Sequence, residues 1–146
     1  IGDAVMATWV GGNVEKGIRN ALRTALEINS ATKKIAQDIP DLETLSIGAA
    51  INTGEAMMGN MGVAGHRDST VIGDVVNVAF RLESMTKKDT YDIIIGQESA
   101  SYIDSPEKYF TPQSFKVKGK AENIETFATS FEQLSYFLTA TAASAP

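Results

Sequence analysis

The pattern of hydrophobic positions near the start of the chain predicts a strand followed by a long helix. Residues 4–10 form a short apolar run, which is typical of a buried strand. From Val14 onward, apolar residues recur three and four positions apart, and Asn13 occupies the position expected for an N-cap. Because a residue that precedes proline is pushed out of the helical region, we expect this helix to end before Pro40.

The pattern in the middle of the chain predicts a hairpin. Residues 45–52 and 56–63 are both apolar enough to form strands, and the Thr53-Gly54-Glu55 segment between them is typical of a turn. The second of these strands is weakened by its glycines. A polar loop over residues 64–69 and a short strand over residues 70–72 should follow.

The second half of the chain predicts a further helix and three more strands. Gly73 begins an amphipathic helical pattern. β-branched residues indicate a strand at 91–95, and a short helix should cover 97–103. Residues 115–118 and 124–131 are expected to form the last pair of strands.

This alternation of strands and helices indicates the α/β class, in the form of an α+β sandwich with helices packed on a largely antiparallel sheet. The length of 146 residues favours one domain. We assign it to residues 1–131. Residues 132–146 end in small residues of low complexity, and we expect them to form a partly disordered tail.

Composition narrows the chemistry that the chain can perform. Thirteen Lys and Arg residues against eighteen Asp and Glu give a net charge of −5, which argues against a nucleic-acid-binding or membrane-binding protein. The absence of cysteine excludes disulfides, thiolate nucleophiles and Cys-based zinc sites. With His66 as the one histidine, a Ser-His-Asp triad is improbable. Catalysis would therefore depend on Asp, Glu, Asn, Arg, Lys, Thr and the backbone.

The richest candidate segment is the helix after Gly73. Asn77 and Arg81 are four residues apart and thus share one helix face, with Asp74 one turn earlier. Arginine presents a planar fork of donors that suits phosphate, and asparagine offers a donor and an acceptor that suit a ribose. The alternative is a solvated polar stripe on an amphipathic helix, and spacing alone favours this alternative.

Two other groups of charged residues each allow two interpretations. Asp3 is either a simple turn residue or a carboxylate ligand of Mg²⁺. Lys116, Lys118 and Lys120 alternate along an expected strand and so share one face, where they would either protect a sheet edge or bind an anion.

Taken together, these segments resemble the class III nucleotidyl cyclase catalytic domain, and the bacterial members most. The resemblance covers about residues 1–131, and four separated motifs agree in order and spacing. The motifs are Ile1-Gly2-Asp3-Ala4-Val5-Met6-Ala7, Ile51-Asn52-Thr53-Gly54-Glu55 with Gly59-Asn60-Met61-Gly62, Val71 to Glu83, and Val117-Lys118-Gly119-Lys120. Phe80 departs from the Ala or Ser of many relatives, and we expect it to lie against the core.

The resemblance implies a ferredoxin-like fold and an adenylate cyclase of signal transduction, which converts ATP into 3′,5′-cyclic AMP and pyrophosphate. It further implies a head-to-tail homodimer with its active sites at the interface. Asp3 matches a metal-binding aspartate, Thr70 the residue that reads the purine and favours ATP over GTP, and Asn77 the residue that orients the ribose. Arg81 matches the residue that stabilises the pentavalent phosphorus, and Lys118 the lysine that holds the terminal phosphates.

The same resemblance implies two Mg²⁺ or Mn²⁺ ions per active site. The family's first metal aspartate, its phosphate loop and its purine-selecting lysine would precede Ile1, on an N-terminal strand and helices that this sequence lacks. We therefore expect residues 1–146 alone to be inactive and prone to self-associate. The domain is expected to be cytoplasmic, without nucleic-acid partners or direct membrane contact.

Two other functions remain open for this sequence. A guanylate cyclase would share most of the motifs, and a non-catalytic cyclase-like domain could serve only regulation and dimerisation. The presence of Asp3, Asn77 and Arg81 favours the enzyme over the second alternative. A diguanylate cyclase would carry a Gly-Gly-Asp/Glu-Glu-Phe hairpin, and no such string occurs here.

Overall fold

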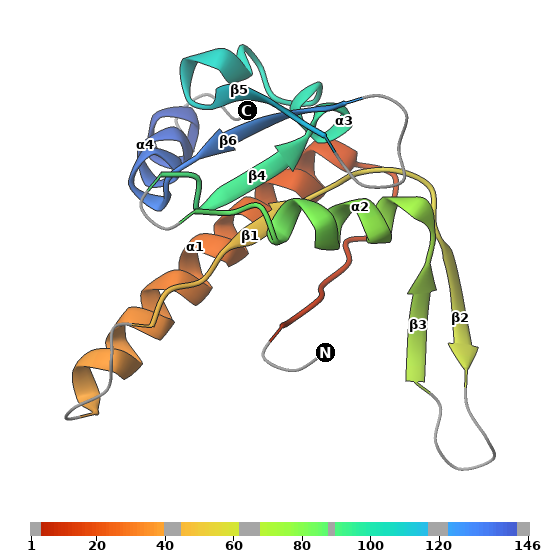
Figure 1. The fold of residues 1–146 in the computed structure, drawn as a ribbon, viewed down its shortest axis with the longest axis horizontal. Coiled ribbons are helices and arrows are strands. Elements are labelled where there is room, and N and C mark those ends of the chain that lie inside the picture. Colours follow the sequence, from red (N-terminus) through yellow and green to blue (C-terminus); the bar gives the residue numbers. More distant parts are fainter. Residues whose placement is uncertain (1–3, 40–44, 62–67, 88–89, 117–122, 143–146) are drawn as a thin grey trace.

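A four-stranded sheet with helices on both faces forms the body of the molecule (Figure 1). The structure is a computed structural model, and it describes residues 4–39, 45–61, 68–87, 90–116 and 123–142. The strand order is β1-β4-β6-β5, with bounds Ala49–Ile51 for β1, Ile93–Gly96 for β4, Ile124–Thr129 for β6 and Thr111–Phe115 for β5. β1 runs parallel to β4, and the other two pairings are antiparallel. The α+β prediction with a largely antiparallel sheet is therefore confirmed.

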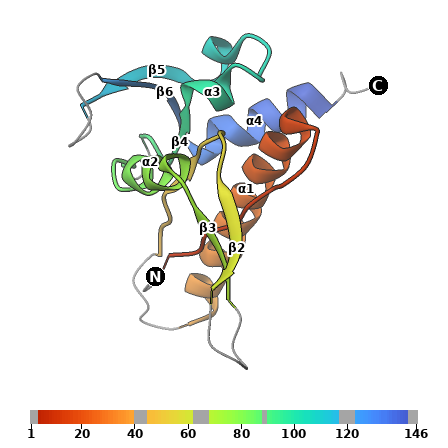
Figure 2. The same cartoon turned by 90° about the vertical axis from the view of Figure 1, so that its right-hand side faces the viewer.

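β4 is buried on both faces and joins two hydrophobic clusters. Ile93 and Ile95 pack in a cluster with helix α1 (Val14–Asp38) and helix α4 (Phe131–Ala142). Ile94 packs in the other cluster, with helix α2 (Asp74–Glu83). Successive strand residues face opposite sides of a sheet, so three consecutive isoleucines bind one helix layer on each side. Figure 2 shows α2 on one side of β4 and the pair α1 and α4 on the other.

Helix α1 has the boundaries that its sequence predicts. The Asn13 side chain accepts a hydrogen bond from the Lys16 N–H at 2.8 Å, which caps the first turn. Ile18 and Leu22 bury the apolar face of the helix, and the helix ends at Asp38, before Pro40.

Helix α4 corrects the prediction of a tail from residue 132. Residues 131–142 are helical, and Leu134 and Phe137 are almost completely buried. The Phe137 ring meets the Phe110 ring edge to face, with 5.4 Å between centroids. The buried Asp92 carboxylate accepts the Phe131 N–H at 3.0 Å. The tail prediction is wrong through Ala142, because the apolar spacing of residues 131, 134 and 137 outweighs the small residues after it.

The predicted hairpin is wrong in its partners. Strand β2 (Met57–Met61) pairs antiparallel with β3 (Asp68–Ile72), while β1 pairs with β4. The two strands form a ribbon that extends away from the sheet (Figures 1 and 2). Local adjacency favoured a β1–β2 hairpin, but pairing with β4 gives β1 a partner that is buried on both faces.

The connections and the edge strand also differ from expectation. Helix α3 covers only Gln97–Ala100, and a 3₁₀ turn, η1, follows at Pro106–Lys108. β5 lies at residues 111–115, where residues 115–118 had been expected. The sequence pattern did not predict a strand at these residues because Pro112 argues against one. Proline is tolerated in β5 because this strand lies at the edge of the sheet.

The segment 4–10 is not the buried strand that its composition predicts. It has no strand assignment, and its side chains are exposed, with Val5 84% exposed. A strand requires a partner backbone, and no strand within the described ranges pairs with this segment. Trp9 lies against the first turns of α1, where a Cβ built on Gly17 would be 3.5 Å from the Trp9 Cβ.

Helix α4 should contribute to the stability of the domain. We expect Leu134→Ala to lower the free energy of unfolding by about 2–5 kcal/mol, because it leaves a cavity at a fully buried position. Ser135→Ala is the matched control on the exposed face of the same helix and should change stability by less than about 0.5 kcal/mol. Urea denaturation followed by circular dichroism measures both values. Equal stability of Leu134→Ala and the wild type would show that α4 does not belong to the core.

Candidate nucleotide site on helix α2

Helix α2 has one apolar face and one exposed polar face. Val78 and Leu82 are buried against the sheet, which fixes how the helix lies. Asn77 and Arg81 follow one another after one turn on the exposed part of the helix surface. The pairing of these two side chains on one face, which their spacing predicts, is therefore confirmed.

The Arg81 guanidinium has no carboxylate within ion-pair distance among the described residues. The main chain of Arg81 is engaged, since its carbonyl accepts a hydrogen bond from the Ser84 hydroxyl at 2.7 Å. This bond closes the last turn of the helix. The turn that carries Arg81 is thus held in place, and its fork of donors lies at an exposed position, as anion binding requires.

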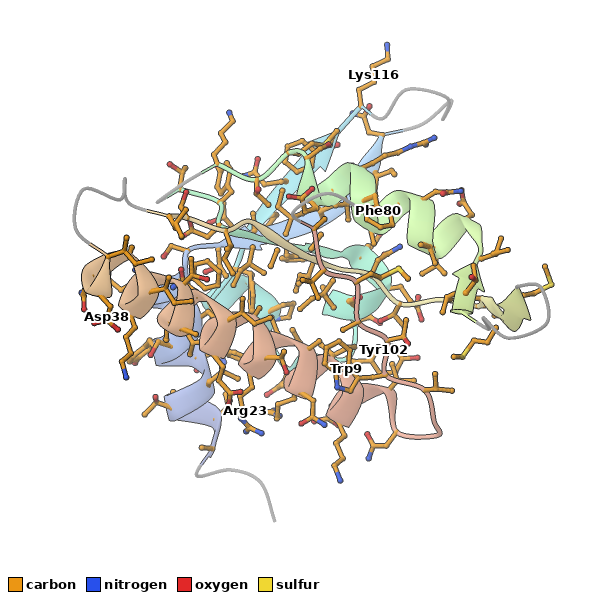
Figure 3. The ribbon with its side chains drawn as sticks, turned by 90° about the horizontal axis from the view of Figure 1, so that it is seen from below. Trp9, Arg23, Asp38, Phe80, Tyr102 and Lys116 are labelled. Atoms are coloured by element: carbon orange, nitrogen blue, oxygen red, sulfur yellow. The ribbon has the colours of Figure 1, made fainter. Side chains whose placement is uncertain are left out.

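Phe80 lies on the solvent side of α2, between Asn77 and Arg81 in sequence, and it is 41% exposed (Figure 3). The expectation that Phe80 packs against the core is therefore wrong. Each residue of a helix is rotated by about 100° from the one before it, so Phe80 lies about 200° from both Val78 and Leu82, opposite the buried face. An aromatic ring therefore lies beside the two polar side chains.

Thr70 lies on β3, shortly before the start of α2. It is half-buried, and its cross-strand partner in β2 is Gly59. Directly opposed side chains of an antiparallel pair share one face, so Thr70 has no neighbouring side chain from that partner. A Cβ added to Gly59 would meet nothing within 4 Å. Among the described residues the space beside Thr70 is therefore open, a feature that the sequence pattern does not predict.

Glycine brings the ribbon and helix α2 close together. Gly73 connects β3 to α2, and a Cβ there would lie 3.1 Å from the Glu55 carbonyl oxygen and 3.3 Å from the Ala56 Cα. Only a residue without a side chain permits this approach without a shift of the neighbouring backbone. The close approach holds the start of α2 against the backbone just before β2.

Four of the positions that the sequence analysis singled out lie outside the described residues: Asp3, His66, Lys118 and Lys120. Lys116 is exposed just beyond the last residue of β5 and points away from the body (Figure 3). The expected alternation of lysines along one strand thus does not begin within β5. Of the predicted site residues within the described ranges, Asn77 and Arg81 lie one turn apart on α2, and Thr70 lies on β3, the strand that precedes this helix.

The described ranges contain no group of three or more His, Asp or Glu side chains that could hold a metal ion. Among the same residues, no helix is both long and apolar enough to cross a membrane. A metal site that used Asp3 would therefore draw on a residue outside the described ranges.

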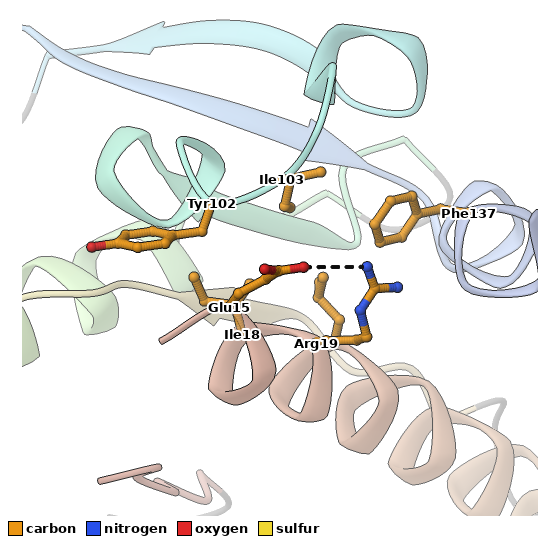
Figure 4. Close-up of a pocket in the computed structure, with 7 residues that line it drawn as sticks. Glu15, Ile18, Arg19, Tyr102, Ile103 and Phe137 are labelled. Carbon is orange, nitrogen blue, oxygen red and sulfur yellow. Dashed lines mark ion pairs between the residues drawn. The ribbon is translucent and has the colours of Figure 1, made fainter. Parts of the chain in front are cut away.

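A small hollow between α1, α4 and residues 102–103, just after α3, is lined by side chains of these three segments (Figure 4). The Arg19 guanidinium donates to the Thr141 hydroxyl at 2.8 Å and lies 3.9 Å from the Glu15 carboxylate. It also lies over the Phe137 ring, 5.8 Å from the centroid. These contacts tie α1 to α4 on the side of the sheet opposite α2, so this hollow is structural.

Comparison with known proteins gives a consistent match. The family model for the adenylate and guanylate cyclase catalytic domain matches residues 1–137. An adenylate cyclase of Anabaena cylindrica is 35% identical over 132 residues, which are 87% of this chain and 26% of that protein. The chain therefore spans about a quarter of the length of that relative.

Two solved structures share the fold. The guanylyl cyclase Cya2 aligns with a TM-score of 0.66 at 21% identity, over 78% of this chain and 58% of that one. The adenylyl cyclase CyaB from P. aeruginosa aligns with a TM-score of 0.62 at 23% identity, over 80% of this chain and 60% of that one. With the fold, the polar face of α2 and the match over residues 1–137 in agreement, the chain belongs to the family of adenylate and guanylate cyclase catalytic domains.

Proposed function

We propose that this domain is an adenylate cyclase that converts ATP into 3′,5′-cyclic AMP and pyrophosphate. The observation that carries the proposal is the placement of Asn77 and Arg81 on the exposed face of α2, one turn apart, just after the strand that holds Thr70. The apolar side of the same helix is locked against the sheet, so the polar pair is presented on a rigid element.

In the proposed reaction, the ribose 3′-oxygen of ATP attacks its own α-phosphorus. A bond forms between that oxygen and the α-phosphorus, and the bond to the pyrophosphate oxygen breaks. The proton of the 3′-hydroxyl passes through solvent to the released pyrophosphate. Since nucleophile and electrophile belong to one molecule, the protein must chiefly fold the substrate and stabilise the developing charge. Asn77 would hold the ribose and Arg81 the charge that develops on the phosphorus oxygens. Lys118 would bind the terminal phosphates.

Two Mg²⁺ or Mn²⁺ ions would complete the site, with Asp3 as a ligand. A carboxylate together with substrate phosphates is the donor set that Mg²⁺ prefers. When bound, such ions lower the pKa of the attacking hydroxyl and neutralise the leaving pyrophosphate.

Two observations support ATP over GTP as the substrate. Thr70 offers a hydroxyl that donates to or accepts from a purine edge, and the space beside it is open at Gly59. The Anabaena relative is named an adenylate cyclase. Guanylate cyclase is the second candidate, because the fold is shared with a guanylyl cyclase.

The active form is proposed to be a homodimer with active sites at its interface. The β2–β3 ribbon extends from the body and exposes large apolar side chains, with Met57 74%, Met58 55% and Ile72 50% exposed. Contiguous exposed apolar residues of this kind are typical of contact surfaces between proteins. In the proposed dimer, one protomer supplies Asp3 and its partner supplies Thr70, Asn77 and Arg81.

Arg81 should affect the rate more than substrate binding. In the intact protein, we expect Arg81→Ala to lower kcat for cyclic AMP formation by about 10²- to 10³-fold, because the substitution removes a cationic contact to the transition state. The KM for ATP should change much less. Arg23→Ala removes an exposed arginine of α1 on the other side of the sheet and should leave both constants unchanged. More than half of the wild-type kcat in Arg81→Ala would contradict this role.

Mixing two inactive variants should restore activity if the site is shared between protomers. Asp3→Ala and Arg81→Ala place their defects on opposite sides of the interface, so a mixed dimer keeps one intact site. We expect each variant alone to be almost inactive and the mixture to regain part of the wild-type turnover, measured as cyclic AMP formed. If the mixture stays inactive although light scattering confirms dimers, both residues act within one chain.

A further inference from the structure

The Asn52 side chain forms a bond to the helix that carries Asn77 and Arg81. Asn52 follows β1 directly, and its Nδ2 donates a hydrogen bond to the Val75 carbonyl oxygen at 3.0 Å. Val75 lies in the first turn of α2, two residues before Asn77. The bond therefore connects the end of a central strand with the start of the helix, across 23 residues of sequence.

On its other side, the Asn52 amide lies against the backbone of Gly96, the last residue of β4. A Cβ built on Gly96 would overlap the Asn52 Oδ1. The backbone of Gly96 is extended, with φ −65° and ψ 156°, a conformation that any residue adopts. Glycine is therefore required at this position for space rather than for its backbone angles. The Asn52 amide is confined between β4 and the first turn of α2.

The residues after Asn52 are held as well. The Thr53 hydroxyl lies 2.9 Å from the hydroxyl of Ser99, which is fully buried in α3. A Cβ on Gly54 would lie 3.1 Å from the Val75 Cγ2, so the backbone here approaches the helix closely. The segment 52–54 thus has fixed contacts to α3 on one side and to α2 on the other.

Strand β1 also meets the far end of α2. A Cβ on Gly48, just before β1, would overlap the Thr86 hydroxyl, just after α2. The helix is thus held at both ends, while Val78 and Leu82 bury its middle. Apolar packing is not directional and allows a helix to slide or rotate by small amounts, whereas a hydrogen bond fixes a direction. The Asn52–Val75 bond supplies the directional contact at the end nearest Asn77.

We propose that Asn52 is a positioning residue that fixes the rotation of α2 and hence the placement of Asn77 and Arg81 toward the nucleotide. The consequence for catalysis rests on the proposed function; the anchoring of α2 does not. Misplacement of catalytic groups by about 1 Å can cost about 100-fold in rate. Expressed as free energies, the effect of losing this bond on kcat should therefore be larger than its effect on the free energy of unfolding.

The experiment compares four variants in the intact protein with the wild type. Asn52→Ala removes the side chain, Asn52→Asp keeps its shape but loses the donor, and Gly96→Ala pushes the amide aside. Thr129→Val is the matched control, because it removes one buried hydroxyl that donates to the Tyr109 carbonyl at 3.1 Å, away from α2. Steady-state kinetics with ATP and hydrogen–deuterium exchange of peptides covering α2 are measured for each.

We expect Asn52→Ala and Asn52→Asp to lower kcat by about 10- to 100-fold, with much smaller changes in the KM for ATP. Exchange in α2 should be about fivefold faster, as loss of one such bond implies. Thr129→Val should change neither quantity in α2. Wild-type kcat and exchange in Asn52→Asp would overturn the proposal, as would equal effects in Thr129→Val.

A double variant tests whether Gly96 acts through Asn52. Gly96→Ala alone should lower kcat about as much as Asn52→Ala does. The double variant, Asn52→Ala with Gly96→Ala, should have a kcat no lower than either single variant, because no amide remains to be displaced. If the fold-losses in kcat of the two single variants multiply in the double variant, this part of the proposal is overturned. An inactive wild type, with α2 exchange still faster in both Asn52 variants, would refute the proposed function and support the anchoring of α2 by Asn52.

Discussion

The burial of β4 on both faces is the constraint on which the rest of the structure depends. Its isoleucines at 93, 94 and 95 alternate between two helix layers, so neither layer can move without exposing part of the strand. This arrangement places α2 against the face of the sheet that carries Ile94. Because Val78 and Leu82 must face Ile94, the polar residues of α2 face away from the sheet. The candidate site is thus a consequence of how the core is built.

The sequence was sufficient where the determining contacts are local. The extent of α1 follows from the Asn13 cap, from its apolar spacing and from Pro40. Asn77 and Arg81 share a face because a helix repeats every 3.6 residues. These features depend on residues a few positions apart, and the rules of helix capping and helix periodicity predict such local contacts well.

The sequence was insufficient where distant segments compete for the same partner. Residues 45–52 could pair with the strand after the turn or with β4, and only the three-dimensional arrangement decides for β4. The apolar run at 4–10 carries the composition of a strand without a partner strand among the described residues. Phe80 is apolar, yet the rotation of α2 leaves it exposed. Asn52 belongs to one of the recognised motifs, but its hydrogen bond to Val75 joins residues 23 positions apart and could be seen only in the fold.

The proposed activity of the domain is the formation of cyclic AMP from ATP. The most direct measurement is mass spectrometry of the products that the intact protein forms from equal concentrations of ATP and GTP with Mg²⁺. We expect 3′,5′-cyclic AMP and pyrophosphate as the main products, with little cyclic GMP. Predominant cyclic GMP would contradict the assignment of Thr70 to adenine, and the absence of any cyclic nucleotide would contradict the proposed cyclase function.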